Sequence, residues 1–160
     1  MEPQGHTIRP VTTPATERLV TIGYQGRSLH GMIARLVAND VRLLLDIRAV
    51  ARSRRPEFNA KRIAAAAGAA GIAYRHVPEL GSSRKLRAHL YETRDFDRFA
   101  GLYLAYVRRW RLPEVHSVAK AARAGTVCIL CYEADHALCH RGIVASEALR
   151  THRKLEVLHL

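Results

Sequence analysis

The sequence has no apolar stretch long enough to cross a membrane, and its start lacks the apolar segment of a secretory signal. It holds only three cysteines, an odd number without the spacing of a disulfide framework. Acidic residues are also few, with 14 Asp and Glu against 26 Lys and Arg. These absences predict a protein that does not span a membrane and works in a reducing, cytoplasmic compartment.

Glycine-rich phosphate-binding patterns are missing as well, since neither the Walker motif nor G-x-G-x-x-G occurs. The formal charge of +12 fits a polyanionic partner such as nucleic acid. The cations are spread along the chain without a basic tail, however, so a solvated Arg-rich surface explains the same charge. Composition leaves both alternatives open.

Short apolar runs alternate with segments of helical periodicity, and the length of 160 residues fits one domain. We expect strands at 19–22, 41–47, 72–77, 127–130 and 155–160, and helices at 29–38, 59–70, 95–110, 113–125 and 137–150. Alternation of this kind predicts an α/β fold, a single-domain layered structure with a mainly parallel sheet of about five strands and flanking helices. Residues 1–18, which contain three prolines, are expected to form a flexible N-terminal arm ahead of the domain at 19–160.

Two further segments carry structural expectations. The stretch 78–85 is polar and is expected to be a long loop. The helix at 95–110 is expected to bury one aromatic face, formed at helical spacing by Phe96, Phe99, Tyr103, Tyr106 and Trp110.

The stretch from Thr126 to Ala145 holds the densest group of reactive side chains. It begins as a buried strand and passes through a polar turn into a helix. In open parallel sheets this edge is where ligands bind, and a helix amino end favours anions and thiolates. The residues that crowd the turn are Cys131, Glu133, Asp135, His136, Cys139, His140 and Arg141.

The three cysteines differ in their expected surroundings. Residues three apart on a strand face opposite sides, so Cys128 and Cys131 should not share a metal, and Cys128 is expected in the core. A metal site remains an alternative if Cys131, Glu133, Cys139 and His140 converge, and such ligands favour zinc or iron. In the preferred interpretation these four residues are catalytic. Cys139 is then a thiol of lowered pKa at the helix amino end, with His140 and Glu133 as acid and base.

A structural alternative is that Cys139 only packs and Arg141 pairs with Glu133 or Asp46. Asp46 and Arg48 end a buried strand and lie on one side of it, either as an ion pair or as part of a site. The sequence does not specify a cofactor.

Several polar residues predict an anionic ligand. Gly23 and Tyr24 open a tight loop whose backbone N–H groups could hold a phosphate, although the sequence favours a plain turn at this position. Between positions 46 and 62, six Lys and Arg face two acids, a balance that suits phosphate groups. The expected ligand-binding residues are Gly23, Tyr24, Asp46, Arg48, Ser53, Arg54 and Arg141.

The chain resembles a bacterial family called domain of unknown function 488, from about residue 19 to its C-terminus. The resemblance implies a single cytoplasmic α/β domain without a settled activity, and it supports treating the motif residues as one site. One departure is Ala51, where the family usually has proline. The motifs that carry the resemblance, in order, are Thr21-Ile-Gly-Tyr24, Asp46-Ile-Arg48, Ser53-Arg-Arg-Pro-Glu-Phe-Asn59, Leu80-Gly81, Cys131-Tyr-Glu133 and Cys139-His-Arg141.

Taken together, the sequence favours a domain that binds a small phosphorylated or nucleotide-like ligand at the carboxyl edge of its sheet, with thiol or acid–base chemistry. It leaves open whether the protein is an enzyme. One alternative is a nucleic-acid-binding module that uses the surface around residues 52–62. The other is the Cys/His metal site.

Overall fold

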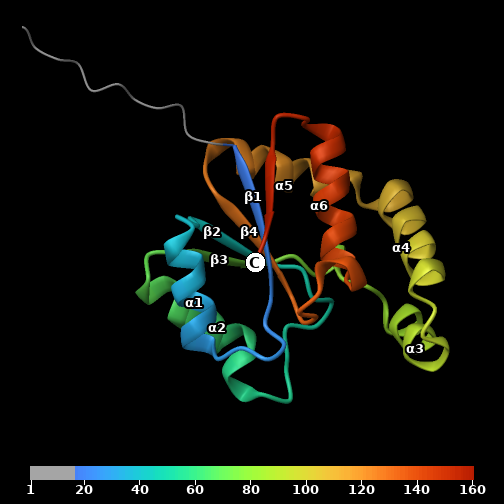
Figure 1. Ribbon diagram of the computed structural model, residues 1–160, viewed down its shortest axis with the longest axis horizontal. Coiled ribbons are helices and arrows are strands. Elements are labelled where there is room, and N and C mark those ends of the chain that lie inside the picture. Colours follow the sequence, from blue (N-terminus) through green and yellow to red (C-terminus); the bar gives the residue numbers. More distant parts are fainter. Residues whose placement is uncertain (1–16) are drawn as a thin grey trace, which may run out of the picture.

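A computed structural model describes residues 17–160, which form a five-stranded, entirely parallel sheet with helices on both faces (Figure 1). The alternation of strands and helices in the sequence correctly predicted this α/β arrangement. Residues 1–16 of the expected arm lie outside the described residues, and Arg18 already belongs to the first strand. The strands are β1 (Arg18–Gly23), β2 (Leu43–Asp46), β3 (Ala73–His76), β4 (Val127–Cys131) and β5 (Glu156–His159).

The strand order is β3-β2-β4-β1-β5, so β4 lies between β2 and β1. In this register Gly23 of β1 aligns with Cys131 of β4, and Asp46 of β2 aligns with Leu130. All five strands run in the same direction, so their carboxyl ends share one edge. The loops that carry the expected site residues therefore meet there.

Two layers of helices cover the sheet, with α1 and α2 on one face and α4, α5 and α6 on the other (Figure 1). Helix α3 packs against α4 at the periphery. Three short 3-10 helices, at Pro56–Phe58 (η1), Pro78–Leu80 (η2) and His136–Leu138 (η3), lie in loops. The α-helices are α1 (Leu29–Ala38), α2 (Ala60–Ala69), α3 (Arg84–Thr93), α4 (Phe96–Trp110), α5 (Leu112–Ala124) and α6 (His140–Thr151).

Alternation along the strands divides the apolar residues between two cores. Val20, Leu44 and Cys128 face α1 and α2, whereas Leu19, Leu45 and Ile129 face α4, α5 and α6. Both cores are buried, as expected for a parallel sheet covered on both sides.

The structure differs from the sequence expectations at α3 and at the end of α4. Residues 78–85 were expected to form one long loop, but η2 occupies Pro78–Leu80 and α3 already begins at Arg84. Ser83 caps α3 by accepting a hydrogen bond from the Leu86 N–H at 3.1 Å. No residue of α3 is fully buried, although Leu86 and Leu90, one helical turn apart, pack against the core in partly buried positions. On α4, Phe99 and Tyr103 are buried as predicted, but Trp110 lies 63% exposed.

Within residues 17–160, no helix combines the length and apolar character needed to cross a membrane.

Candidate functional site

Four potential metal or acid–base groups converge at the carboxyl edge of the sheet, on the face covered by α4–α6. Cys131 is the last residue of β4, Glu133 lies in the following turn, and Cys139 and His140 cap and begin α6. One donor atom from each of the four lies within 4.8 Å of every other. The sequence prediction that these side chains can converge is confirmed.

The Glu133 carboxylate joins the two thiols. Its Oε2 accepts hydrogen bonds from the Sγ atoms of Cys139 at 3.0 Å and Cys131 at 3.2 Å. His140 Nδ1 lies 3.5 Å from Cys131 Sγ and 3.9 Å from Cys139 Sγ. Both thiols therefore face a carboxylate and an imidazole at once.

A backbone carbonyl group fixes the orientation of the His140 ring. Its Nε2 lies 3.2 Å from the Ile47 carbonyl oxygen, which can only accept a hydrogen bond, so Nε2 carries the proton. Nδ1 is then left with a lone pair toward the two sulfur atoms. The ring of Tyr103 packs edge-on against the imidazole, with centroids 5.3 Å apart.

Burial controls the protonation of this cluster. Burial raises the pKa of the Cys139 thiol, and the neighbouring His140 only partly opposes this. Burial alone would raise the pKa of Glu133 as well, but hydrogen bonds from Cys139, a backbone N–H and Cys131 lower it. The sequence prediction of a lowered Cys139 pKa is therefore wrong, because desolvation outweighs the helix amino end.

We expect all three cysteines to resist alkylation in the native, chelator-treated protein at neutral pH. Cys128, Cys131 and Cys139 are all buried, and the raised pKa of Cys139 keeps its thiol protonated until strongly alkaline pH. Peptide mass spectrometry after iodoacetamide treatment, with and without urea, measures this. Rapid native labelling of Cys139 at pH 7 would contradict it.

The Arg141 side chain binds backbone carbonyl groups of the turn and does not form the expected ion pair with Glu133 or Asp46. The guanidinium, which is fully buried, donates to the carbonyl oxygens of Glu133 and Ala134 and lies 3.4 Å from Thr21 Oγ1. The turn also packs closely against the end of β1, since a Cβ atom on Gly23 would lie 1.7 Å from the Glu133 carbonyl oxygen. Gly23 and Arg141 thus hold Glu133 in place.

Asp46 and Arg48 form a second network at the same edge, on the face covered by α1 and α2. Arg48 binds the Asp46 carboxylate through Nε at 2.8 Å and Nη2 at 2.6 Å. Its Nη1 donates to the Phe58 carbonyl oxygen and to the Tyr24 hydroxyl, and Tyr24 stacks on Phe58. Of the two alternatives for this pair, the ion pair is present.

The loop around Ser53 and Arg54 is organised by its own hydrogen bonds. Asn59 precedes α2 but does not cap it with its side chain, because its Oδ1 accepts from the Ser53 N–H at 2.8 Å. Ser53 Oγ accepts from the Arg55 N–H, and Arg54 is exposed to solvent. Because Arg48 and Arg141 are engaged inside the protein, Arg54 is the residue of the expected ligand set whose positive charge faces water.

A family model described as "Domain of unknown function DUF488" matches residues 28–148, about three quarters of the chain. The chain belongs to the DUF488 family. The match includes the Asp46–Arg48 pair and all four clustered residues, but it begins after Gly23 and Tyr24 and is therefore shorter than the expected resemblance. No curated protein and no solved structure matched the chain.

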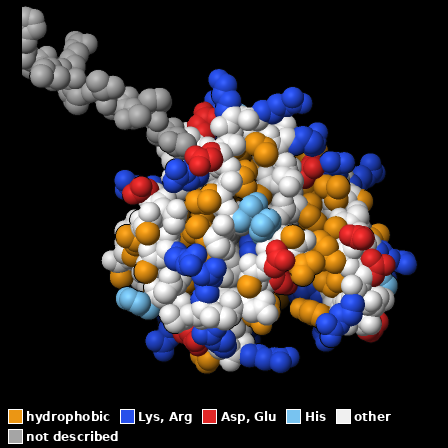
Figure 2. Space-filling view, viewed as in Figure 1, with side chains coloured by type: hydrophobic (Ala, Val, Ile, Leu, Met, Phe, Trp, Pro, Cys, Tyr) orange, Lys and Arg blue, Asp and Glu red, His pale blue; other side chains and the backbone are white. Residues whose placement is uncertain are grey.

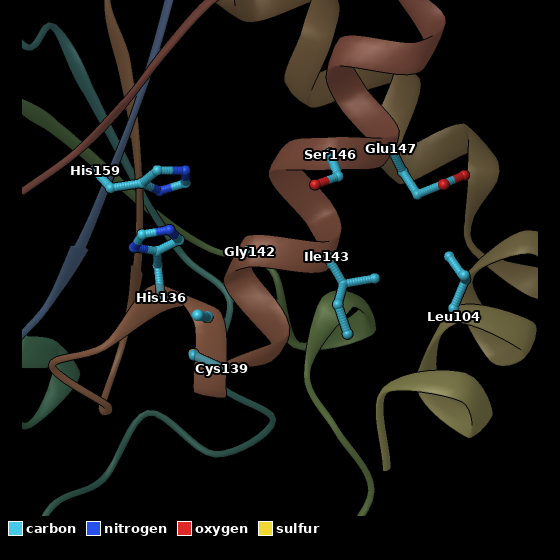
Figure 3. A pocket seen from close by; sticks show the side chains of 9 residues that line it. Leu104, His136, Cys139, Gly142, Ile143, Ser146, Glu147 and His159 are labelled. Atoms are coloured by element: carbon cyan, nitrogen blue, oxygen red, sulfur yellow. The ribbon is translucent and has the colours of Figure 1, made fainter. Parts of the chain in front are cut away.

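Sequence reasoning missed a cavity of about 380 Å³ beside Cys139 in this DUF488 protein (Figure 3). On one side of the cavity, the rings of His136 and His159 stack with centroids 3.6 Å apart. His159 Nδ1 lies 2.8 Å from Thr21 Oγ1, and burial lowers the pKa of this imidazole. No local sequence signal marks this cavity, because the parallel strand register that places His159 beside Thr21 is a tertiary feature.

Proposed function

We propose that this DUF488 protein binds a zinc ion through Cys131, Cys139, His140 and Glu133. The observation that carries the proposal is the mutual approach of one oxygen, one nitrogen and two sulfur atoms within 4.8 Å. Thiolate and imidazole ligands favour zinc among the common divalent ions, and two Cys with one His and a carboxylate suit a tetrahedral site.

The distances within the cluster support a tetrahedral ion. Zn–S bonds of about 2.3 Å and Zn–N bonds of about 2.0 Å place a sulfur and a nitrogen ligand roughly 3.5 Å apart. His140 Nδ1 lies 3.5 and 3.9 Å from the two sulfur atoms. The carboxylate oxygen, at 3.0 and 3.2 Å from them, would move outward by a few tenths of an ångström.

The surroundings of the cluster also suit an ion. Metal-binding histidines donate their second ring N–H to a carbonyl or carboxylate, and His140 has this partner in the Ile47 carbonyl oxygen. Two thiolates and a carboxylate leave one net negative charge around Zn²⁺. The buried guanidinium of Arg141, which is bonded to the Glu133 carbonyl oxygen, offsets that charge.

The exposure of the four ligands supports a hydrolytic role for the site. Cys131, Cys139 and His140 are buried, whereas Glu133 is partly exposed and is the ligand that water can reach. Catalytic zinc sites keep three protein ligands and one exchangeable position, where bound water becomes acidic. Zinc held by Cys131, Cys139 and His140 would supply such an acidic water, and Glu133 is the carboxylate of the cluster that could serve as a proton acceptor.

The proposal predicts about one zinc ion per chain in protein purified without chelators. Loss of an outer-shell partner already costs about 10–100-fold in metal affinity, so we expect Cys131→Ser to cost more than about 100-fold. Metal analysis by mass spectrometry gives the content, and competition with a chromophoric chelator gives the affinity. Cobalt substitution should add thiolate-to-metal charge transfer and tetrahedral d–d bands.

The matched control is Cys128→Ala, because Cys128 lies on the same strand but faces the opposite core. This variant should keep the full metal content and the cobalt spectrum. If Cys131→Ser binds zinc as tightly as the unmodified protein, or if the two variants lose zinc equally, the proposal is wrong.

A nucleic-acid-binding function receives less support from the arrangement of charge. On the face shown in Figure 2, Lys and Arg side chains lie scattered around the periphery and do not gather into one stripe. Arg55, within the basic loop, pairs with Glu57 at 2.8 Å. Binding to nucleic acid would usually use a continuous basic surface.

A further inference from the structure

A second cavity, of about 280 Å³, lies between the loop after β2, the segment after β3 and helix α4. None of the four proposed zinc ligands lines it, although Tyr103 forms part of its wall and also touches His140. Most of the wall is apolar, and the polar part is the segment at the start of α3. The residues that line it include Ala49, Ser82, Ser83, Leu86, Tyr103 and Tyr106.

Ser82 brings an unpartnered hydroxyl to this cavity. The residue is 1% exposed, and its Oγ has no hydrogen-bond partner among the described residues. A buried polar group without a partner costs about 1–3 kcal/mol, so native proteins rarely keep one without a reason. The position of Ser82 is fixed by Gly81, where a Cβ atom would lie 2.3 Å from the Ala49 backbone.

The amino end of α3, where Ser83 lines the cavity, adds donors and positive charge next to it. Ser83 caps the Leu86 N–H, which leaves the N–H groups of Arg84 and Lys85 without intrahelical partners. The first turn holds no acidic residue and carries these two cations instead. Cations are unfavourable at the positive end of a helix dipole, and an anion bound there would offset both.

We propose that this cavity binds a small organic anion with a compact apolar body, such as an aryl phosphate. The anionic group would accept hydrogen bonds from Ser82 Oγ and the first N–H groups of α3. The apolar body would pack on Leu86 and on the rings of Tyr103 and Tyr106. This site is independent of the proposed zinc centre, because it uses none of its ligands.

The test is a titration of chelator-treated protein with phenyl phosphate, followed by amide NMR. We expect saturable shifts centred on residues 82–86. Because a hydrogen bond to a charged group contributes about 1.5–3 kcal/mol, Ser82→Ala should weaken binding by about tenfold or more. Lys85→Gln, at an exposed position, should weaken binding and reduce its dependence on salt.

The matched control is Ser146→Ala, which alters an exposed serine in the cavity beside Cys139 and should leave the affinity unchanged. Ser82→Ala should also keep or raise the melting temperature, since the substitution removes a buried hydroxyl that has no partner. Unchanged affinity in Ser82→Ala, shifts centred on the other cavity, or equal affinity for inorganic phosphate would each overturn the proposal. Metal removal precedes every titration, so failure of the zinc proposal would not affect these outcomes.

Discussion

Asp46→Ala is expected to lower the free energy of unfolding by about 3–5 kcal/mol. The Asp46 carboxylate is fully buried and accepts two hydrogen bonds from the Arg48 guanidinium, one from the Arg48 backbone N–H and one, at 2.7 Å, from the Tyr74 hydroxyl. Its removal leaves a buried guanidinium without a counter-charge. Urea denaturation followed by circular dichroism measures the loss.

Two comparisons separate the buried charge from a general effect of the substitution. Glu57→Ala removes a carboxylate from the Arg55–Glu57 pair, whose side chains are both about two-fifths exposed, and should cost less than about 1 kcal/mol. The double variant Asp46→Leu with Arg48→Met should be more stable than Asp46→Ala, because no unpaired charge remains. If Asp46→Ala costs no more than Glu57→Ala, the network does not stabilise the fold.

Gly23→Ala is expected to cost about 3 kcal/mol and to lower zinc affinity as well. The new Cβ would lie 1.7 Å from the Glu133 carbonyl oxygen and 3.1 Å from Arg141 Nη1. The backbone oxygen cannot rotate away as a flexible side chain would, so the turn that carries Glu133 must move. Urea denaturation and the chelator competition described above measure the two effects.

Gly68→Ala provides the control for this substitution. Gly68 lies in α2, and nothing lies within 4 Å of a Cβ atom built on it. Alanine should therefore stabilise the helix by about 0.5–1 kcal/mol and leave zinc affinity unchanged. Full stability and full metal content in Gly23→Ala would show that the turn does not pack closely against Gly23 of β1.

Local sequence patterns predicted the parts of the structure that depend on strand and helix periodicity. Alternation placed Asp46 with Arg48 and separated Cys128 from Cys131, and both expectations are confirmed.

Tertiary register and burial determined the features that the sequence did not reveal. Asp46 aligns with Leu130, so Cys131 faces the other side of the sheet, and the expected single site divides into two networks. The pKa of Cys139 depends on how completely α4 and the turn exclude water, which no local motif encodes. Arg141 binds carbonyl groups, because the turn folds back over the end of β1.

The position of β1 between β4 and β5 has a consequence for synthesis on the ribosome. β1 is the first strand to emerge, yet both of its neighbours lie near the other end of the described chain, beginning at Val127 and Glu156. Until they arrive, both edges of β1 lack partners and are open to pairing with other chains. Gly23 therefore meets the Glu133 turn only late in translation, and we infer that the proposed zinc site is completed only after most of the domain has been made.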